Sequence, residues 1–231
     1  MKRAANAKTR PSIEDSDLEG ENWPAEVPSS KGLRLERRLT EKGGLPPFET
    51  LSWEKRSSVI QEADGTVVFE NKHVEVPTTW SQLATDIVAH KYFRKAGVPL
   101  QGEPTKTGSE TSVKQVVYRV AHTIREFGFK EGYFATEADA ETFEMKLTYL
   151  LVHQMGAFNS PVWFNCGLFH EYGIQGSGGN WYWDTQEQIL KPTQDAYSQP
   201  QCSACFIQAV DDDLMSIFDL VKNEARLFKH G

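Results

Sequence analysis

The feature that most constrains the fold is an apolar stripe in the middle of the chain. Its members recur every three or four residues: Val113, Val116, Val117, Val120, Ile124 and Phe127. That spacing places them on one face of an α-helix, and Gly128 follows where such a helix would end. TEAD at 136–139 is typical of a helix cap, with Asp in place of Glu, and predicts a second helix. Its stripe is Ala140, Phe143, Leu147, Leu150 and Leu151. We therefore predict a mainly helical domain over residues 32–155.

The text before these helices predicts a tail, a hairpin and one more helix. Residues 1–31 are polar and partly acidic, which predicts a flexible tail. Asp64-Gly65 before TVVFE indicates a β-hairpin. Thr79 is expected to cap a helix that ends near Gly97. The apolar face of that helix would be Trp80, Leu83, Ala84, Ile87 and Val88.

The elements predicted after residue 155 follow the order expected of an α/β unit. A long loop, rich in glycine and aromatic residues, spans 167–197 and is predicted to be functional or mobile. CFIQAV at 205–210 predicts a buried strand, and a last helix begins at Asp212 or Asp213. A pair of strands with one covering helix cannot close a sheet. We therefore expect residues 156–231 to be an incomplete part of an α/β domain.

Composition narrows the classes of partner. The net charge is −7 and the pI is about 5.4, so a basic groove for nucleic acid is not favoured. No apolar run approaches the roughly 18 residues of a membrane span, and no apolar segment follows the basic first residues as in a secretory signal. These features predict a cytoplasmic protein without a membrane or nucleic-acid partner.

The three cysteines allow three interpretations. Cys202 and Cys205 form a C-x-x-C, which is typical of a redox dithiol or of half a zinc site. Cys166 and His170 are four residues apart and would complete a set of four zinc ligands. Free thiols that are simply buried among apolar side chains are the third interpretation. Spacing alone leaves all three open.

Two further segments carry groups that can bind a nucleotide. Ser160 precedes Pro161, which favours an extended conformation and a strand start where the hydroxyl could bind phosphate or ribose. The same Asn-Ser-Pro text also suits an ordinary turn. Asp211, Asp212 and Asp213 suit helix capping, or hydrogen bonding to ribose hydroxyls. Three histidines are expected to be structural: His153, His170 and His230.

Long phrases of the sequence resemble one known family. These are NSPVWFNCGL at 159–168, HEYGIQGSGGNWYWD at 170–184 and DAYSQPQCSACFIQAVDDDLMSIFDLVKNEARLFKHG at 195–231. The text at 74–99 and 111–128 is also similar. The family is the class II, vitamin B12-dependent ribonucleotide reductases. The resemblance runs from about residue 32 to the end of the sequence and concerns the N-terminal part of that family.

The resemblance implies a fold and a reaction. The fold is a ten-stranded α/β barrel preceded by a helical domain, so residues 156–231 would be the start of that barrel. The reaction reduces ribonucleoside diphosphates to 2′-deoxyribonucleotides by a radical mechanism with adenosylcobalamin as cofactor. A thiyl radical abstracts the 3′-hydrogen of the ribose, and a cysteine pair then supplies the reducing equivalents and becomes a disulfide.

The same resemblance implies roles for matched residues. Cys205 corresponds to the first cysteine of the reducing pair, which leaves Cys202 outside the matched catalytic positions. Ser160 corresponds to a residue that contacts the substrate near its phosphate. Ala204, Cys205 and Gly231 fall at further substrate-binding positions.

The regulatory expectations and partners also come from the family. Asp212 and Asp213 fall where a deoxynucleotide or ATP effector binds, with the last helix at a subunit interface. The expected partners are the ribonucleotide substrate, a thioredoxin-type reductant and a second copy of the chain in a homodimer.

The sequence departs from the family pattern by what it lacks. The radical cysteine, the second reducing cysteine and most of the cobalamin contacts have no counterpart in these 231 residues. We therefore expect the chain to be inactive alone, as a fragment or a split-gene half that a complementing C-terminal chain would complete. Two other functions stay open: a zinc-binding structural module using Cys166, His170, Cys202 and Cys205, and a nucleotide-binding regulatory fragment.

Overall fold

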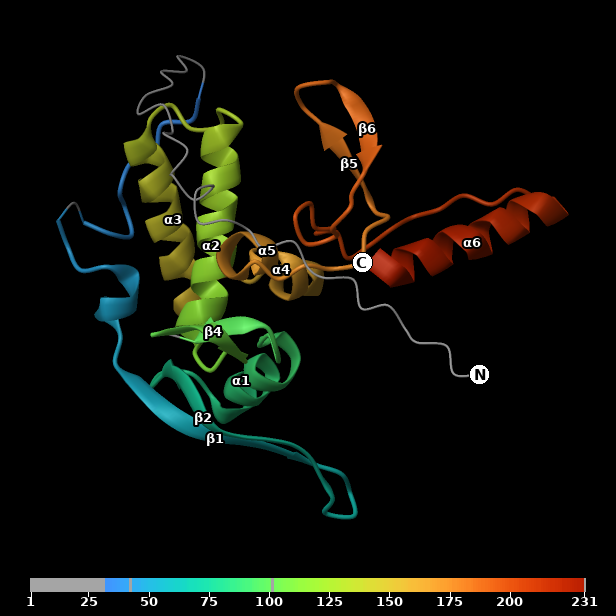
Figure 1. Cartoon of the computed structure of the whole chain (residues 1–231). Helices are drawn as coiled ribbons and strands as arrows, with labels where there is room; N and C mark the ends of the chain where they lie inside the picture. The colour runs from blue at the N-terminus through green and yellow to red at the C-terminus, as the bar shows by residue number, and fades with distance from the viewer. Residues whose placement is uncertain (1–31, 42, 101, 231) are drawn as a thin grey trace, which may run out of the picture.

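The computed structural model describes residues 32–230 apart from 42 and 101, so the predicted tail at 1–31 and Gly231 lie outside it. The chain begins with a short helical turn, η2 (Pro47–Thr50), and a long antiparallel hairpin of β1 (Trp53–Gln61) and β2 (Val67–Pro77). The turn contains Asp64-Gly65, as predicted: Thr66 N donates to Asp64 Oδ1 at 2.9 Å, and Gly65 has a φ of +87°. The hairpin projects from the rest of the molecule (Figure 1).

The helix predicted after Thr79 is present but has different ends. α1 (Gln82–Ile87) is capped by Ser81, whose Oγ accepts from Ala84 N at 3.1 Å, so Thr79 is not the cap. The helix continues as a π-helical turn, η3 (Val88–Tyr92), and stops there rather than near Gly97. A short antiparallel pair follows, β3 (Val98–Leu100) and β4 (Glu103–Gly108).

The two central helices are confirmed. α2 (Val113–Lys130) begins at a capping box of Ser112 and Gln115, and α3 (Glu137–Val152) begins at Thr136, whose Oγ1 accepts from Asp139 N at 3.2 Å. They pack side by side (Figure 1). Gly128 is not past the end of α2 but inside it. A Cβ there would lie 2.6 Å from the ring of Phe134, so the glycine serves close packing rather than helix termination.

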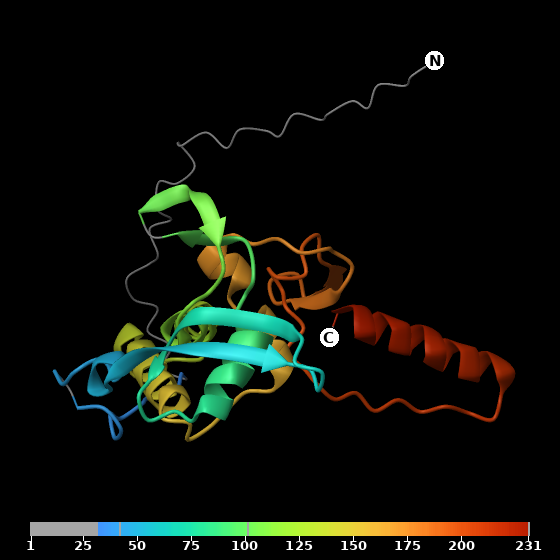
Figure 2. The ribbon, with the colours of Figure 1, turned by 90° about the horizontal axis from the view of Figure 1, so that it is seen from below.

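The last third of the chain contains two short helices, a hairpin and a separate helix. α4 (Ser160–Asn165) and α5 (Leu168–Tyr172) pack on α2. The predicted long loop contains a hairpin of β5 (Trp181–Asp184) and β6 (Ile189–Pro192), which its sequence pattern did not predict. α6 (Leu214–His230) begins after Asp213 as predicted and lies apart from the other helices, with its C-terminal end nearest to them (Figures 1 and 2).

The buried strand predicted at 205–210 is wrong for this structure. Residues 201–211 have no regular secondary structure, and Phe206, Ile207 and Val210 are exposed. The physical reason is that no other strand among the described residues lies beside them. An apolar run without a hydrogen-bonding neighbour cannot form a sheet.

The main core lies where the hairpin, η3 and the two central helices meet. Its buried members are Val74, Val76, Val88, Ala89, Phe93, Val113, Val116, Val117, Leu151 and Val152. The strands form three separate two-stranded sheets. This mixture of helices and strands is compatible with the α/β class, whereas the ten-stranded barrel and the division at 155/156 stay predictions. No helix in the described part of the chain is long and apolar enough to cross a membrane.

Candidate active site around Ser160 and the cysteines

Ser160 lies at the first turn of α4, not at a strand start. Asn159 caps this helix, with its Oδ1 accepting from Val162 N at 3.4 Å, and Pro161 occupies a position in the first turn where a missing N–H costs nothing. This local chemistry overrides the extended preference of a residue before proline. The Ser160 hydroxyl lies 3.2 Å from the hydroxyl of Tyr92.

Tyr92 reaches Ser160 because the first helix ends in a π turn. In η3 the N–H of Phe93 bonds to the carbonyl of Val88 at 3.0 Å, five residues back instead of four. Single π turns of this kind are frequent at functional sites. The ring of Tyr92 also lies against Phe164 of α4, with centroids 5.3 Å apart. The turn thus fixes an aromatic wall beside the candidate substrate serine.

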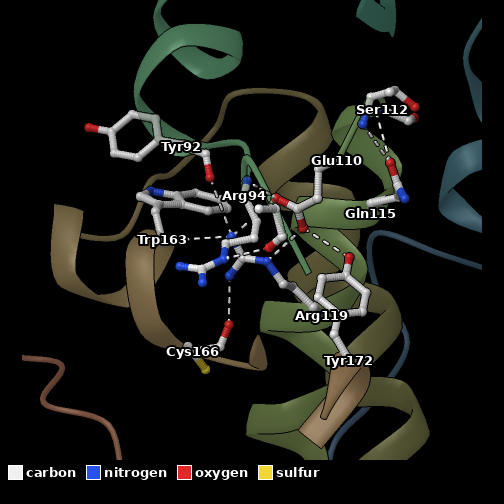
Figure 3. Close-up of polar contacts among 11 residues, drawn as sticks. Tyr92, Arg94, Glu110, Ser112, Gln115, Arg119, Trp163, Cys166 and Tyr172 are labelled. Atoms are coloured by element: carbon white, nitrogen blue, oxygen red, sulfur yellow. Dashed lines mark hydrogen bonds and ion pairs between the residues drawn. The ribbon is translucent and has the colours of Figure 1, made fainter. Parts of the chain in front are cut away.

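A buried ion pair holds this region together. Arg119 of α2 and Glu110 are both fully buried, and Arg119 Nε donates to Glu110 Oε1 at 2.8 Å (Figure 3). Tyr172 Oη donates to the same oxygen at 2.9 Å, and Arg94 N donates to Glu110 Oε2 at 2.7 Å. Burial raises the pKa of the Tyr172 hydroxyl, which therefore stays protonated as a donor.

The other side of Arg119 clamps the backbone around Ser160. Its guanidinium donates to the carbonyls of Cys166 at 2.6 Å and Trp163 at 2.7 Å, and more weakly to Tyr92 O at 3.4 Å (Figure 3). One side chain thereby joins η3 to the C-terminal half of α4. Gly167 lets the chain pass this close: its φ is +82°, and a Cβ there would clash with the Arg119 carbonyl.

The structure pairs Cys166 with Cys202, not Cys202 with Cys205. Cys166 ends α4 and is 4 % exposed, and Cys202 packs against it together with Val120 and Val162. The contact with the Cys202 thiol and burial raise the pKa of Cys166, while the contact with Cys166 lowers the pKa of Cys202. All three cysteines are free thiols, and Cys205 is exposed.

The zinc set proposed from the sequence is not formed. His170 lies beside the carbonyl of Ser198, at 3.3 Å, and its ring packs on Phe127. Among residues 32–41, 43–100 and 102–230, no group of three or more His, Cys, Asp or Glu side chains could hold a metal ion. The interpretation of Cys166 as a buried thiol agrees with its environment.

The remaining candidate positions lie on the exposed segment before α6. Ala204 and Asp212 are exposed, and Asp213 caps α6, with Oδ2 accepting from Met215 N and Ser216 N at 3.0 Å each. No hydrogen bond in the described part of the chain links the segment of Cys205 to Ser160, the candidate substrate serine.

Sequence reasoning missed the clamp formed by Glu110, Arg119 and Tyr172. A signal for it was present. Arg119 falls between Val116 and Val120 on the apolar face of α2, where an unpaired charge would be very costly. A charged residue on a buried stripe predicts a buried partner, but the sequence does not say which carboxylate supplies it.

The cavities do not fit a cobalamin. An apolar cavity of about 420 Å³ lies between α1, α2 and the segment before α4, and its lining has few polar side chains, among them Gln154 and Tyr92. Drug-sized ligands fill about 300–1,000 Å³. A corrin with its amide arms is several times larger than such ligands and needs many polar partners. No residue described here is therefore assigned to that cofactor.

Comparison with known proteins shows which family the chain is similar to. Residues 54–154, from β1 through α3, match the family model described as class II vitamin B12-dependent ribonucleotide reductase. The chain is thus a relative of the N-terminal part of the B12-dependent ribonucleotide reductases, and the resemblance seen in the sequence is confirmed.

Individual relatives extend the match to most of the chain. A vitamin B12-dependent ribonucleotide reductase of Rhodopirellula baltica is 45 % identical over 201 residues, which cover 87 % of this chain and 19 % of the relative. One from Agrobacterium fabrum is 42 % identical over 229 residues, covering 86 % and 18 %. One from Streptomyces clavuligerus is 40 % identical over 205 residues, covering 88 % and 18 %. The chain spans about a fifth of the length of these curated relatives.

Proposed function

We propose that this chain supplies the substrate serine and one reducing cysteine of a vitamin B12-dependent ribonucleotide reductase. The observation that carries the proposal is the 45 % identity to a reductase of that name over 87 % of the chain. The proposed cofactor of the whole protein is cobalamin, in its adenosyl form. The proposed substrate is a ribonucleoside diphosphate, and the reductant is a dithiol protein of the thioredoxin type.

In this proposal Ser160 binds the substrate near its phosphate. The hydroxyl of Ser160 donates a hydrogen bond to a phosphate oxygen, and the neighbouring Tyr92 hydroxyl orients it. Arg119 keeps α4 and η3 in place through its bonds to their carbonyls. A serine held by a rigid surround loses less freedom on binding than a serine on a mobile loop.

Cys205 acts as a reducing thiol. Together with a second cysteine it gives two electrons and two protons to the ribose, whose 2′-hydroxyl leaves as water. The two thiols become a disulfide, which the dithiol protein reduces for the next cycle. Cys205 is exposed in this structure, so its sulfur is accessible to the substrate and to the dithiol protein.

We also propose that the start of α6 binds a nucleotide effector. Asp213 uses one carboxylate oxygen to cap the helix, so Asp212 is the better candidate to accept hydrogen bonds from the ribose of a deoxynucleotide or ATP. The apolar face of α6 is exposed at Ile217, Phe218 and Val221. A second copy of the chain in a homodimer would cover such a face.

A chimera tests the function. Residues 32–231 of this chain replace the matched part of the Rhodopirellula baltica relative. The chimera is assayed with adenosylcobalamin, a dithiol and either ribonucleoside diphosphates or ribonucleoside triphosphates. Formation of deoxyribonucleotide is the expected result. Cys205→Ser should abolish turnover, and Cys202→Ser is the matched control that should leave turnover measurable. A folded chimera that makes no deoxyribonucleotide, beside an active relative, would contradict the proposal.

A further inference from the structure

Cys166 and Cys202 come from segments far apart in the sequence, yet their side chains share one apolar cluster. Cys166 is at the end of α4, and Cys202 follows the β5–β6 hairpin. Cys202 packs directly against the cluster formed by Cys166, Val120 and Val162. Both also line a mainly apolar cavity of about 480 Å³, so the pair has access to a small reagent.

Both cysteines are held by their backbones. The carbonyl of Cys166 accepts from Arg119 at 2.6 Å, and its N–H donates to Val162 O at 3.0 Å. The segment of Cys202 is tied down just before it, because Asn165 Nδ2 donates to Gln201 O at 3.2 Å and Asn180 Nδ2 donates to Gln199 O at 2.7 Å. Hydrogen bonds therefore hold the backbone of Cys166 and the segment just before Cys202 in the positions that bring the two side chains into one cluster.

Cys202 is also the last residue before Cys205 whose side chain is not exposed. From Ser203 to Phe206 every residue is exposed. The pair thus sits at the point where the anchored part of the chain meets the free part. A covalent bond there would fix the base of the segment that carries Cys205.

We propose that Cys166 and Cys202 form a reversible disulfide by exchange with a small-molecule or protein disulfide. Cys202, half-buried and reachable, attacks the incoming disulfide RSSR as a thiolate, forms a mixed disulfide and releases RS⁻. The Cys166 sulfur then attacks the Cys202 sulfur and releases the second thiol, and the Cys166 proton passes to the leaving RS⁻. Two protein thiols are oxidised and one external disulfide is reduced to two thiols. This pair is distinct from the reducing cysteine of the proposed function and does not rest on that function.

The electrostatics of the two thiols agree with these separate roles. The neighbouring Cys166 thiol lowers the pKa of Cys202, which favours the thiolate that begins the exchange. The pKa of Cys166 is raised, so this sulfur keeps its proton until the mixed disulfide stands next to it.

Disulfide mapping under a graded redox buffer tests the proposal. The whole chain is equilibrated with reduced and oxidised glutathione in steps, trapped with N-ethylmaleimide, digested and analysed by mass spectrometry. The expected result is loss of two of the three thiols, a Cys166–Cys202 cross-link and an alkylated Cys205. Cross-linking of Cys202 to Cys205 instead, or no Cys166–Cys202 cross-link at any ratio, would overturn the proposal.

Two variants keep the result specific. Cys205→Ser should form the same cross-link, because Cys205 takes no part in it. Cys166→Ser should stop at the mixed disulfide of Cys202 with glutathione, seen as a single added glutathione. Should Cys166→Ser fail to fold, the map of the unaltered chain decides by itself.

Discussion

Glu110 and Arg119 pair at 2.8 Å without any exposed side-chain surface, and each is the main charged partner of the other. Removing two charges from water is costly, and only the pairing and the surrounding hydrogen bonds offset that cost. Replacing one member leaves the other buried and uncompensated. The pair is therefore a sensitive point for stability, and Arg119 also holds the backbones of α4 and η3 through the carbonyls of Trp163, Cys166 and Tyr92.

Arg119→Met should strongly destabilise the chain. Breaking a buried pair by removing one partner costs about 3–5 kcal/mol, which would appear as a lower midpoint of urea unfolding. Arg38→Met is the control, because Arg38 pairs with Glu36 on the surface at 3.2 Å and such pairs contribute about 0–1 kcal/mol. Equal midpoints for the two variants would contradict the clamp.

Gly167→Ala should be more harmful than Gly132→Ala. Both glycines have a positive φ, +82° and +72°, which costs an L-residue about 1–2 kcal/mol. A Cβ at Gly132 meets open space, whereas one at Gly167 clashes with the Arg119 carbonyl. Overpacking adds about 1–3 kcal/mol, so the two free energies of unfolding should differ by that amount. Similar values would mean that the close approach at Gly167 is unimportant.

Tyr92→Phe should weaken substrate binding in the active chimera. The hydroxyl that lies 3.2 Å from Ser160 Oγ is lost, while the ring and its packing remain. A hydrogen bond contributes about 0.5–1.5 kcal/mol, so KM should rise about two- to tenfold. Tyr133→Phe, at an exposed tyrosine, is the matched control. An unchanged KM for Tyr92→Phe would remove Tyr92 from the site.

His170 should make stability depend on pH in a defined direction. Burial, the largest cause, lowers its pKa from the ordinary value of 6.5. The unfolded chain then takes up a proton at a higher pH than the folded chain, so this stabilisation is present above pH 6.5 and declines as the pH falls below it. Because the side chain is half exposed, the effect is screened.

The check compares the chain with a His170→Asn variant. Urea midpoints of both proteins are measured at pH 7.5 and at pH 5.5. The pH dependence of groups that the two proteins share cancels in the difference between their midpoints. The difference between the two proteins should be smaller at pH 5.5. A difference that grows on acidification would show that the folded state binds the proton more tightly than the unfolded state.

Local signals predicted the elements that local chemistry decides. The Asp64-Gly65 turn, the Thr136 cap and the stripe of α2 each need only residues close in sequence. The exposed run at 205–210 shows where prediction from local sequence fails, because a strand needs a neighbouring strand that the residues of the run do not themselves supply. The same limit applies to the site: Ser160 was predicted, whereas its neighbours Tyr92 and Arg119 come from other elements.

The π turn at η3 has a consequence for how this stretch of chain can vary. A π turn amounts to one residue inserted into an α-helix, and each helical residue turns the chain by about 100°. Deleting one residue from Val88–Tyr92 would restore regular helical bonding and rotate Tyr92 away from Ser160. We therefore expect this stretch to accept changes of side chain more readily than changes of length.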